Sequence, residues 1–236
     1  MPVQRGIHAD IERGEVIALI GPSGSGKTTF VKLMAGILMP TTGTVNIGGH
    51  AVSKLAPEQS AALIGYIPQD FEFIPGSIAA NISGFVTEIV NDRVADAAKK
   101  VGLHDLIQSL PDGYRTHLVS TGNGFSRGQL QRLALARSLY NDPAIVVMDE
   151  PSSSLDQIGE DHVLDAIEVL KKSGKTVIIV AHRPSILTHT DRVIVLKNGT
   201  IETIGRYSEI LPYITGRSAA KPPPEKTASL VEKVRI

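Results

Sequence analysis

The sequence predicts an α/β domain with a mixed sheet, an antiparallel β edge and an inserted α-helical subdomain. Its apolar runs at 16–20, 145–148 and 176–181 are short and unbroken, which is typical of strands buried on both faces of a parallel sheet. Amphipathic helical segments separate these runs. Asn198-Gly199 between two further apolar runs predicts a tight hairpin, so we expect the sheet to close with an antiparallel strand.

The other elements follow from hydrophobic periodicity along the chain. In chain order we expect a helix at 27–38, strands at 44–47 and 63–67, a mostly helical segment at 88–110, a helix that carries Leu130 and Leu133, a helix at 157–172, and hairpin strands at 193–196 and 200–204. These elements form one domain over 1–216, whose helical subdomain covers about 72–142. After Arg217 the composition shifts to Ala, Lys and three consecutive prolines, which predicts a disordered tail over 217–236.

Composition and charge limit the classes of function. The chain has 236 residues with 42% hydrophobic content, enough to bury a substantial core. Lys plus Arg and Asp plus Glu both number 24, so the zero net charge gives no long-range attraction for nucleic acid. The sequence lacks cysteine, which excludes disulfides, thiolate metal sites and cysteine nucleophiles. It also lacks a signal peptide and any run of about 18 apolar residues, so we expect the chain itself to be soluble.

A phosphate-binding loop is predicted between the first apolar strand and the helix after it. The residues from position 21 match the pattern G-x-x-x-x-G-K-[ST] and read Gly21, Pro22, Ser23, Gly24, Ser25, Gly26, Lys27 and Thr28. The glycines let backbone N–H groups surround a phosphate, and Lys27 can reach the β- and γ-phosphates. Thr28 can bind Mg²⁺, with Thr29 beside it in the nucleotide-binding set. The alternative is a glycine-rich turn with a surface lysine, but the strand before it and the helix after it favour nucleotide binding.

Two carboxylates follow the apolar strand at 145–148. Asp149 lies at the end of the strand, where α/β sheets bind ligands, and suits Mg²⁺ directly or through water. Glu150 is one residue further on and could polarise an attacking water as general base. A helix cap or a bond to a neighbouring lysine would explain the same residues. Because a phosphate loop is also present, we favour the functional interpretation.

The segment at the start of the Leu130 helix points to one family of phosphate-loop proteins. It reads Phe125-Ser126-Arg127-Gly128-Gln129, and here the sequence resembles the ATP-binding cassette (ABC) family, whose signature is Leu-Ser-Gly-Gly-Gln. The family's other motifs appear in order along nearly the whole chain: Gln69 matches its Q-loop, Ser154-Leu155-Asp156 its D-loop, and His182 its switch histidine.

The resemblance implies roles for these matched residues. Gln69 would contact Mg²⁺ and contribute to catalysis. His182 lies one strand beyond Glu150, where an imidazole could bond the γ-phosphate and the attacking water. In isolation, a loop glutamine and a structural histidine at a strand end are the alternative interpretations.

The resemblance also implies an ATP-dependent homodimer. Two copies would pair head to tail, with each MgATP between one phosphate loop and the partner's signature residues Ser126, Gly128 and Gln129. A helix N-terminus at this signature offers a second anion-binding surface, so ATP would hold the pair together and loss of the γ-phosphate would release it. Asp156 would couple the two sites across the interface.

Two departures from the family pattern bear on this expectation. Phe125 replaces the signature leucine, and Arg127 replaces the first signature glycine. Because Ser126 and Gly128 are retained, we expect activity to survive, with Arg127 either facing solvent or adding charge near the partner's phosphates. The family's aromatic residue that stacks on adenine is expected upstream of Met1.

Several short strings resemble exporters in particular. The stretch at 72–82, the stretch at 110–114 and Ala181-His182-Arg183-Pro184-Ser185 are similar to type I protein secretion ATPases of the protease and lipase exporter kind. By similarity, a six-helix transmembrane domain would precede this chain in the parent protein and contact it between Gln69 and Asn81. The resemblance then places the domain at the cytoplasmic face of the inner membrane. A periplasmic adaptor and an outer-membrane channel would be further partners.

Three other functions remain to be weighed. A regulatory module that binds ATP but hydrolyses it poorly would fit Arg127, although Glu150 and His182 argue against it. A soluble, non-transport ABC ATPase of DNA repair or translation would carry a coiled-coil insert or a basic surface, and the sequence shows neither. A phosphate-loop GTPase needs an Asn-Lys-x-Asp guanine reader, which the sequence lacks.

Overall fold

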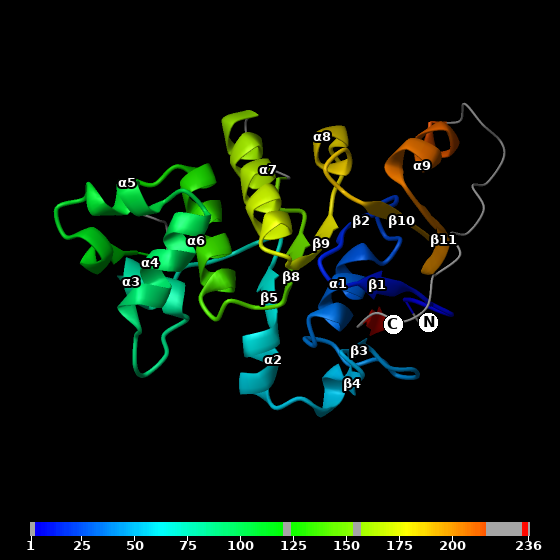
Figure 1. Cartoon of the computed structure of the whole chain (residues 1–236), viewed down its shortest axis with the longest axis horizontal. Helices are drawn as coiled ribbons and strands as arrows, with labels where there is room; N and C mark the ends of the chain where they lie inside the picture. The colour runs from blue at the N-terminus through cyan, green and yellow to red at the C-terminus, as the bar shows by residue number, and fades with distance from the viewer. Residues whose placement is uncertain (1–2, 120–123, 153–156, 216–232, 236) are drawn as a thin grey trace.

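A computed structural model describes residues 3–119, 124–152, 157–215 and 233–235. A six-stranded sheet with the order β11-β10-β2-β9-β8-β5 forms its centre (Figure 1). The strands are β2 (Val16–Ile20), β5 (Ile64–Ile67), β8 (Ile145–Asp149), β9 (Thr176–Val180), β10 (Arg192–Lys197) and β11 (Thr200–Gly205). All neighbours pair in parallel except β10 and β11, which pair antiparallel. The predicted mixed sheet with an antiparallel edge is confirmed.

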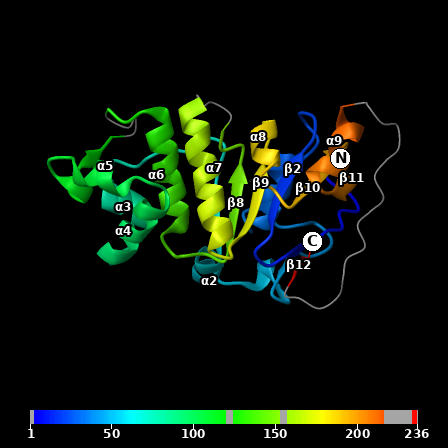
Figure 2. The same cartoon turned by 45° about the horizontal axis from the view of Figure 1, so that its top comes forward.

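Helices cover both faces of this sheet and extend beyond one of its ends. They are α1 (Lys27–Met34), α2 (Pro57–Leu63), α3 (Ile78–Ser83), α4 (Asn91–Lys100), α5 (His104–Gln108), α6 (Arg127–Leu139), α7 (Gln157–Lys172), α8 (Pro184–Leu187) and α9 (Tyr207–Ile214), with short 3₁₀ turns at Val52–Lys54 and Gly113–Arg115. Helices α3 to α6 gather at one end, and α7 lies between them and the strands in both views (Figures 1 and 2).

Two small sheets complete the described structure. One has the order β1-β12-β3-β4 and consists of β1 (Asp10–Glu12), β12 (Lys233–Arg235), β3 (Asn46–Ile47) and β4 (His50–Ala51). The other pairs β6 (Gly76–Ser77) with β7 (His117–Leu118). β12 pairs antiparallel with both β1 and β3, so the end of the chain returns to the start of the domain.

Alternate residues of the central strands are buried on opposite faces of the sheet. In β2, Val16, Ala18 and Ile20 belong to the cluster under α7, whereas Ile17 and Leu19 pack with Phe30 and Met34 of α1. Such double burial explains why the strands are continuous apolar runs in the sequence. β2 ends at Ile20, and the next residue, Gly21, begins the predicted phosphate loop.

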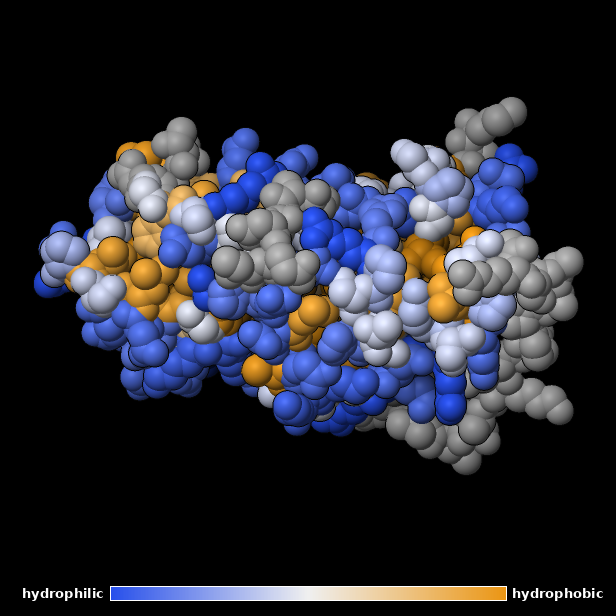
Figure 3. All heavy atoms as spheres, turned by 90° about the horizontal axis from the view of Figure 1, so that it is seen from above, coloured by the Kyte–Doolittle hydropathy of each residue, from blue (hydrophilic) through white to orange (hydrophobic). Residues whose placement is uncertain are grey.

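The helical end shares a core with the sheet. Apolar side chains of α3 to α6 join those of the strands in one buried cluster, which includes Ile82, Val94, Ala97, Ile107, Leu133 and Leu139. α6 packs against α3, α4, α7 and β5. Seen from above, the same end of the molecule shows apolar atoms interrupted by polar ones (Figure 3). Whether 72–142 behaves as a subdomain of its own stays a prediction.

The boundaries of several predicted elements differ in the structure. The helix expected at 27–38 ends at Met34, because Gly36 adopts a left-handed conformation with φ +70° and turns the chain. Gly102, with φ +64°, similarly divides the helical segment at 88–110 into α4 and α5. Leu63 ends α2 instead of starting a strand, so β5 begins at Ile64.

The predicted disordered tail differs from the structure at its end. Residues 216–232 and 236 lie outside the described part of the chain, but Lys233–Arg235 forms β12. The alternation that would mark a strand is too short in these three residues to be recognised in a sequence, and backbone pairing with β1 and β3 defines it instead. Among the described residues, no helix has both the length and the apolar character needed to cross a membrane.

Candidate functional site

The loop at 21–26 leads from β2 directly into α1. Gly26 is the N-cap of α1 with φ +101°, and its carbonyl accepts the first helical bond from Phe30 N at 2.9 Å. The backbone N–H groups of Lys27, Thr28 and Thr29 therefore precede the first intrahelical donor and have no acceptor within the helix. Together with the positive end of the helix dipole, this first turn offers a binding surface for phosphate oxygens.

Glycine is required at the first position of the loop. A Cβ atom on Gly21 would lie 2.1 Å from Leu196 O of β10 and 2.8 Å from Ser25 Oγ. Its φ of +152° is also a conformation that other residues rarely adopt. Among the described residues, Ser25 Oγ is buried and has no hydrogen-bond partner. The loop is thus pressed against β10 and keeps one hydroxyl for a ligand.

Lys27 folds back over the loop that precedes it. Its side chain is buried, and Nζ donates hydrogen bonds to Gly21 O at 3.0 Å and Pro22 O at 3.2 Å. An ammonium group has three donors, so these two bonds leave one for another acceptor. The Lys27 ammonium is thus held beside the loop, where a β- or γ-phosphate would bind.

Thr28 and Asp149 face each other across the gap between α1 and β8. Thr28 Oγ1 lies 3.5 Å from Asp149 Oδ1, and Asp149 is 1% exposed. Burial raises the pKa of the Asp149 carboxyl above its ordinary value, while the Thr28 hydrogen bond and Lys32 and Lys27 oppose that shift. A hydroxyl and a carboxylate oxygen are ligands that Mg²⁺ accepts, and Mg²⁺ usually takes only one or two protein groups beside phosphates and water. The pair therefore fits a Mg²⁺ ion bound with a nucleotide.

Glu150 lies between Gln69 and His182. Its Oε1 accepts a hydrogen bond from His182 Nε2 at 2.8 Å, and its Oε2 accepts one from Gln69 Nε2 at 3.3 Å. Because a carboxylate only accepts, the Nε2–H tautomer of the imidazole is the donor. Three residues that lie far apart in the sequence, at the ends of β5, β8 and β9, therefore meet at one carboxylate.

The backbone at Glu150 is strained. Its φ is +51°, a left-handed value that is uncommon for residues other than glycine. This turn takes Glu150 out of the sheet, whereas Asp149 is the last residue of β8 and stays buried. Strain of this kind costs about 1–3 kcal/mol and is concentrated at functional sites.

The predicted signature residues form the beginning of α6. Ser126 is the N-cap, and its Oγ accepts a hydrogen bond from Gln129 N at 3.2 Å, while Gln129 Oε1 accepts one from Ser126 N at 2.8 Å. This capping box fixes the first turn of the helix and leaves the Ser126 O–H free to donate. Ser126 and Arg127 are both exposed. A ligand from outside the chain can therefore approach this helix end.

The signature and the phosphate loop do not meet within one chain. α6 and α1 lie on opposite sides of α7 and the strands β8 and β9 in both views (Figures 1 and 2). The predicted D-loop residue Asp156 lies outside the described residues, as do Ser154 and Leu155. The structure thus brings together two groups of predicted residues, one around Lys27, Asp149 and Glu150 and one at Ser126.

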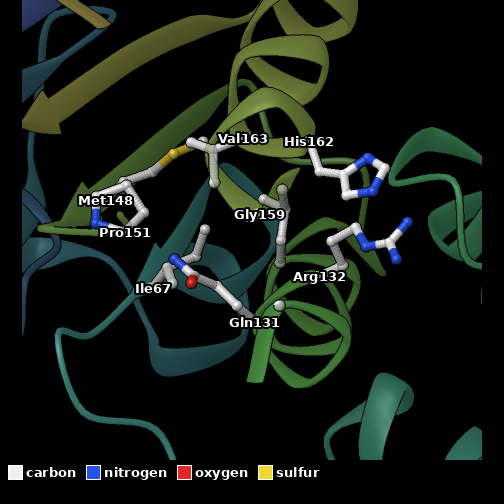
Figure 4. A pocket seen from close by; sticks show the side chains of 10 residues that line it. Ile67, Gln131, Arg132, Met148, Pro151, Gly159, His162 and Val163 are labelled. Atoms are coloured by element: carbon white, nitrogen blue, oxygen red, sulfur yellow. The ribbon is translucent and has the colours of Figure 1, made fainter. Parts of the chain in front are cut away.

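A small pocket lies between α6, α7 and the strands beneath them (Figure 4). Its lining includes Gly128 and Gly159, and a Cβ on Gly128 would lie 3.6 Å from Gly159 Cα, so the helices approach closely there. Arg132 and His162 lie side by side at one end of it in Figure 4. The lining contains no residue of the phosphate loop and neither Glu150 nor His182, but it includes Gly128 of the predicted signature.

Sequence reasoning missed the support that the phosphate loop receives from the start of the chain. Gln4 Nε2 donates to Gly26 O at 2.9 Å, and Arg5 N donates to Gly199 O at 2.9 Å. Gly199 N in turn donates to Ser25 O at 3.2 Å. The hairpin turn at Gly199 was predictable, but nothing in the sequence indicated that it would rest against the loop.

A second missed residue is Arg137 of α6. It donates hydrogen bonds to Asn81 O at 2.9 Å, Asn81 Oδ1 at 3.0 Å and Glu72 O at 3.1 Å, and its guanidinium lies 4.8 Å from the Phe73 ring centroid. Asn81 is fully buried and also bonds the backbone of Ile74. These contacts fix the segment that follows Gln69 against the helical end.

Comparison with known proteins agrees with this geometry. The model of the family described as "ABC transporter" matches residues 4–153. The type I secretion system ATP-binding protein PrsD of Rhizobium meliloti is 38% identical over 205 residues, 87% of this chain and 35% of that protein. The ATP-dependent lipid A-core flippase of Ralstonia nicotianae is 38% identical over 208 residues, 87% of this chain and 35% of that protein.

Further relatives include another secretion protein and a solved exporter. The leukotoxin translocation ATP-binding protein LktB of Mannheimia haemolytica is 38% identical over 210 residues, 89% of this chain and 30% of that protein. The structure of a bacterial Atm1-family ABC exporter with ATP bound superposes with a TM-score of 0.80 at 30% identity, covering 93% of this chain and 39% of the exporter chain. The chain therefore spans about a third of the length of these relatives.

Proposed function

Because this chain belongs to the ABC transporter family, we propose that it binds and hydrolyses MgATP as a head-to-tail dimer and powers export through a membrane domain. The proposal depends most on one observation, the convergence of Gln69 and His182 on Glu150 next to the Thr28–Asp149 pair. A phosphate loop alone would support nucleotide binding. The carboxylate with its two partners is what supports hydrolysis.

The phosphate loop would hold the triphosphate. Loop amides and the first turn of α1 would bind phosphate oxygens, and Lys27 would neutralise charge on the β- and γ-phosphates. Thr28 and Asp149 would hold Mg²⁺. Gln69, whose side-chain nitrogen bonds Glu150, would contribute its side-chain oxygen to the ion as a further ligand. Mg²⁺ would supply charge stabilisation at the β- and γ-phosphate oxygens.

Glu150 would act as the general base toward the attacking water. Its carboxylate is held from both sides, by His182 on one oxygen and Gln69 on the other, so its orientation is set before the nucleotide binds. His182 is half exposed and borders the same space. When Glu150 takes a proton from the water, the imidazole N–H of His182 would turn toward the γ-phosphate or the water.

The separation of the two proposed anion-binding surfaces supports the dimer. Ser126 and the N-terminus of α6 are exposed and lie apart from the same chain's phosphate loop. A second copy would bring its own Ser126, Gly128 and Gln129 against the γ-phosphate bound at the first loop. We propose that Asp156 couples the two sites across this interface.

The proposed coupling surface to the membrane domain is the segment after Gln69. Ile74, Phe85, Val86 and Val90 are exposed apolar residues of this part of the chain. Arg137 bonds the backbone of Glu72 and Asn81 bonds that of Ile74, so a membrane domain that docks near Ile74 would be connected to the segment that begins at Gln69.

We propose type I secretion of a polypeptide as the transport process. PrsD and LktB, both named as secretion or toxin translocation ATP-binding proteins, support this choice, whereas the lipid A-core flippase leaves lipid export as the alternative. In type I secretion the domain would work at the cytoplasmic face of the inner membrane. Its partners would be the transmembrane domain, a periplasmic adaptor and an outer-membrane channel.

ATP turnover by the chain tests the proposal. Phosphate release should require Mg²⁺ and should fall in Glu150→Gln by a factor of about 10² or more, the usual contribution of a general base. Glu168→Gln on α7, which removes a carboxylate that pairs with Lys172, is the matched control and should keep full activity. Equal turnover by wild type and Glu150→Gln would refute the assignment of the base, and a regulatory ATP-binding module would then be the better account.

A further inference from the structure

Tyr66 and Asp149 lie on neighbouring strands and face the same side of the sheet. In the parallel ladder of β5 and β8, Tyr66 is opposite Val147, and Asp149 is two residues beyond Val147. Residues two apart on a strand point to the same face. With strands about 4.8 Å apart and a rise of about 3.3 Å per residue, the Tyr66 and Asp149 Cα atoms are diagonal neighbours at about 8 Å.

Both side chains end in a buried oxygen that lacks a partner. Within the described residues, Tyr66 OH and Asp149 Oδ2 have no hydrogen-bond partner, whereas Asp149 Oδ1 faces Thr28. Buried polar groups are rarely left unsatisfied, because each costs about 1–3 kcal/mol. The two oxygens are therefore complementary, since a phenol can donate and a carboxylate can accept.

The electrostatics agree that the two groups are close. Burial, and then the nearby Asp149 carboxylate, raise the pKa of the Tyr66 phenol to about 12. The contribution of Asp149 to this shift agrees with a phenol that faces the carboxylate.

We infer that Tyr66 is a positioning residue for the metal-binding carboxylate: its hydroxyl donates to Asp149 Oδ2 through one bound water, and so aims Oδ1 at Thr28. This inference rests on the proposed function, because it concerns the carboxylate that would hold Mg²⁺. It adds a residue that no motif marks, on the strand that ends just before Gln69. Tyr66 touches neither the nucleotide nor the water, so its effect passes through Asp149.

The test measures metal-dependent nucleotide binding in place of turnover. Mn²⁺ replaces Mg²⁺ as a paramagnetic probe, and the affinity of the chain for ADP is measured with and without Mn²⁺, together with the Mn²⁺ signal itself. Tyr66→Phe should weaken ADP binding in Mn²⁺ about fivefold to tenfold, the size of one typical intramolecular hydrogen bond. Its affinity for ADP without metal should equal that of the wild type.

Tyr114→Phe is the matched control. Tyr114 is also partly buried, and burial and the nearby Asp105 raise its pKa to about 12, but its hydroxyl bonds His104 at the helical end. This variant should bind ADP like the wild type with and without Mn²⁺. A loss equal to that of Tyr66→Phe would show a general effect of removing a buried phenol and would overturn the inference.

A double variant separates an effect of Tyr66 through Asp149 from a general effect on packing. In Asp149→Asn the metal-binding carboxylate is already lost, so adding Tyr66→Phe should change Mn²⁺-dependent affinity no further. Unchanged Mn²⁺ dependence in Tyr66→Phe, or an equal loss with and without metal, overturns the role of Tyr66 and leaves the proposed function standing. If the wild type itself shows no Mn²⁺-dependent affinity, the proposed function fails and the inference fails with it.

Discussion

His182 Nε2 lies 2.8 Å from Glu150 Oε1, although the two residues are separated by α7 and β9 in the sequence. The bond joins the ends of two adjacent parallel strands, β8 and β9, at the edge where α/β sheets bind ligands. It connects the residue proposed as base to the residue proposed to contact the γ-phosphate.

The first prediction concerns His182. His182→Ala should lower kcat for ATP about 10²-fold to 10⁴-fold, because Glu150 loses the partner that orients it. The dissociation constant for ATP should change little, since the loop and Lys27 supply the binding. Turnover and ATP titration measured on the same sample check both expectations. His189→Ala, whose ring bonds its near neighbours Ser185 and Thr188, is the control. A His182→Ala variant with wild-type kcat would contradict the assigned contact.

The second prediction concerns the first residue of the loop. Gly21→Ala should abolish nucleotide binding and lower the melting temperature, because its Cβ would overlap Leu196 O at 2.1 Å. Gly43→Ala separates overlap from backbone strain, since Gly43 has φ +85° with open space around it. The Gly43 variant should lose only about 1 kcal/mol and keep full nucleotide binding. Calorimetry and ATP titration measure both effects, and similar behaviour of the two variants would exclude steric overlap as the cause.

Part of the candidate site could be predicted from the sequence alone. The loop at 21–28 and the carboxylates Asp149 and Glu150 were predictable, because each set lies in a short contiguous stretch at the end of an apolar strand. We expected His182 one strand beyond Glu150 and Gln69 near Mg²⁺, but not that both side chains would bond Glu150. The distances, and the left-handed turn at Glu150, depend on how the parallel strands align.

Features that depend on long-range packing were not predictable. Tyr66 lies in an apolar strand and matches no motif, so only the register of β5 with β8 connects it with Asp149. Arg137 looks like an ordinary helical arginine until α6 packs against the segment around Asn81. The strand at 233–235 was missed, because its pairing with β1 reaches across nearly the whole sequence.

The third prediction concerns Arg137. Arg137→Met should lower the free energy of unfolding by about 2–4 kcal/mol, because it leaves the buried carbonyl and side chain of Asn81 without their charged donor. Arg132→Met on the same helix removes one bond, to Gly102 O, and should cost about 1 kcal/mol. Urea titration of both variants measures the difference. Equal costs would mean that Arg137 does not hold the segment after Gln69.

The fourth prediction concerns pH. Hydrogen bonds from Lys100 and Lys175 hold the pKa of the Asp142 carboxyl below its ordinary value of 3.8. A carboxyl with a lowered pKa stabilises the folded state above the unfolded pKa, and that contribution is lost as the pH falls through the folded pKa. Because Asp142 is 64% exposed, the two pairs should contribute only about 0.5–1 kcal/mol.

Asp142→Asn tests this sign. The φ of Asp142 is +50°, and asparagine tolerates that conformation as well as aspartate does, so the substitution removes the charge and keeps the turn. Unfolding curves should show the variant less stable than the wild type at pH 7 and at pH 5, with the gap closing below about pH 4. A gap that stays constant down to pH 3 would show that the charge is not its origin.

The central claim is that one copy's phosphate loop and a second copy's Ser126 edge hold the same nucleotide. Light scattering of the Glu150→Gln variant with saturating ATP and Mg²⁺ tests it most directly. The account predicts a particle of twice the 25.2 kDa of one chain, which returns to one chain with ADP or when Ser126 is replaced by Glu. A mass that stays at one chain while ATP occupies the site would contradict it.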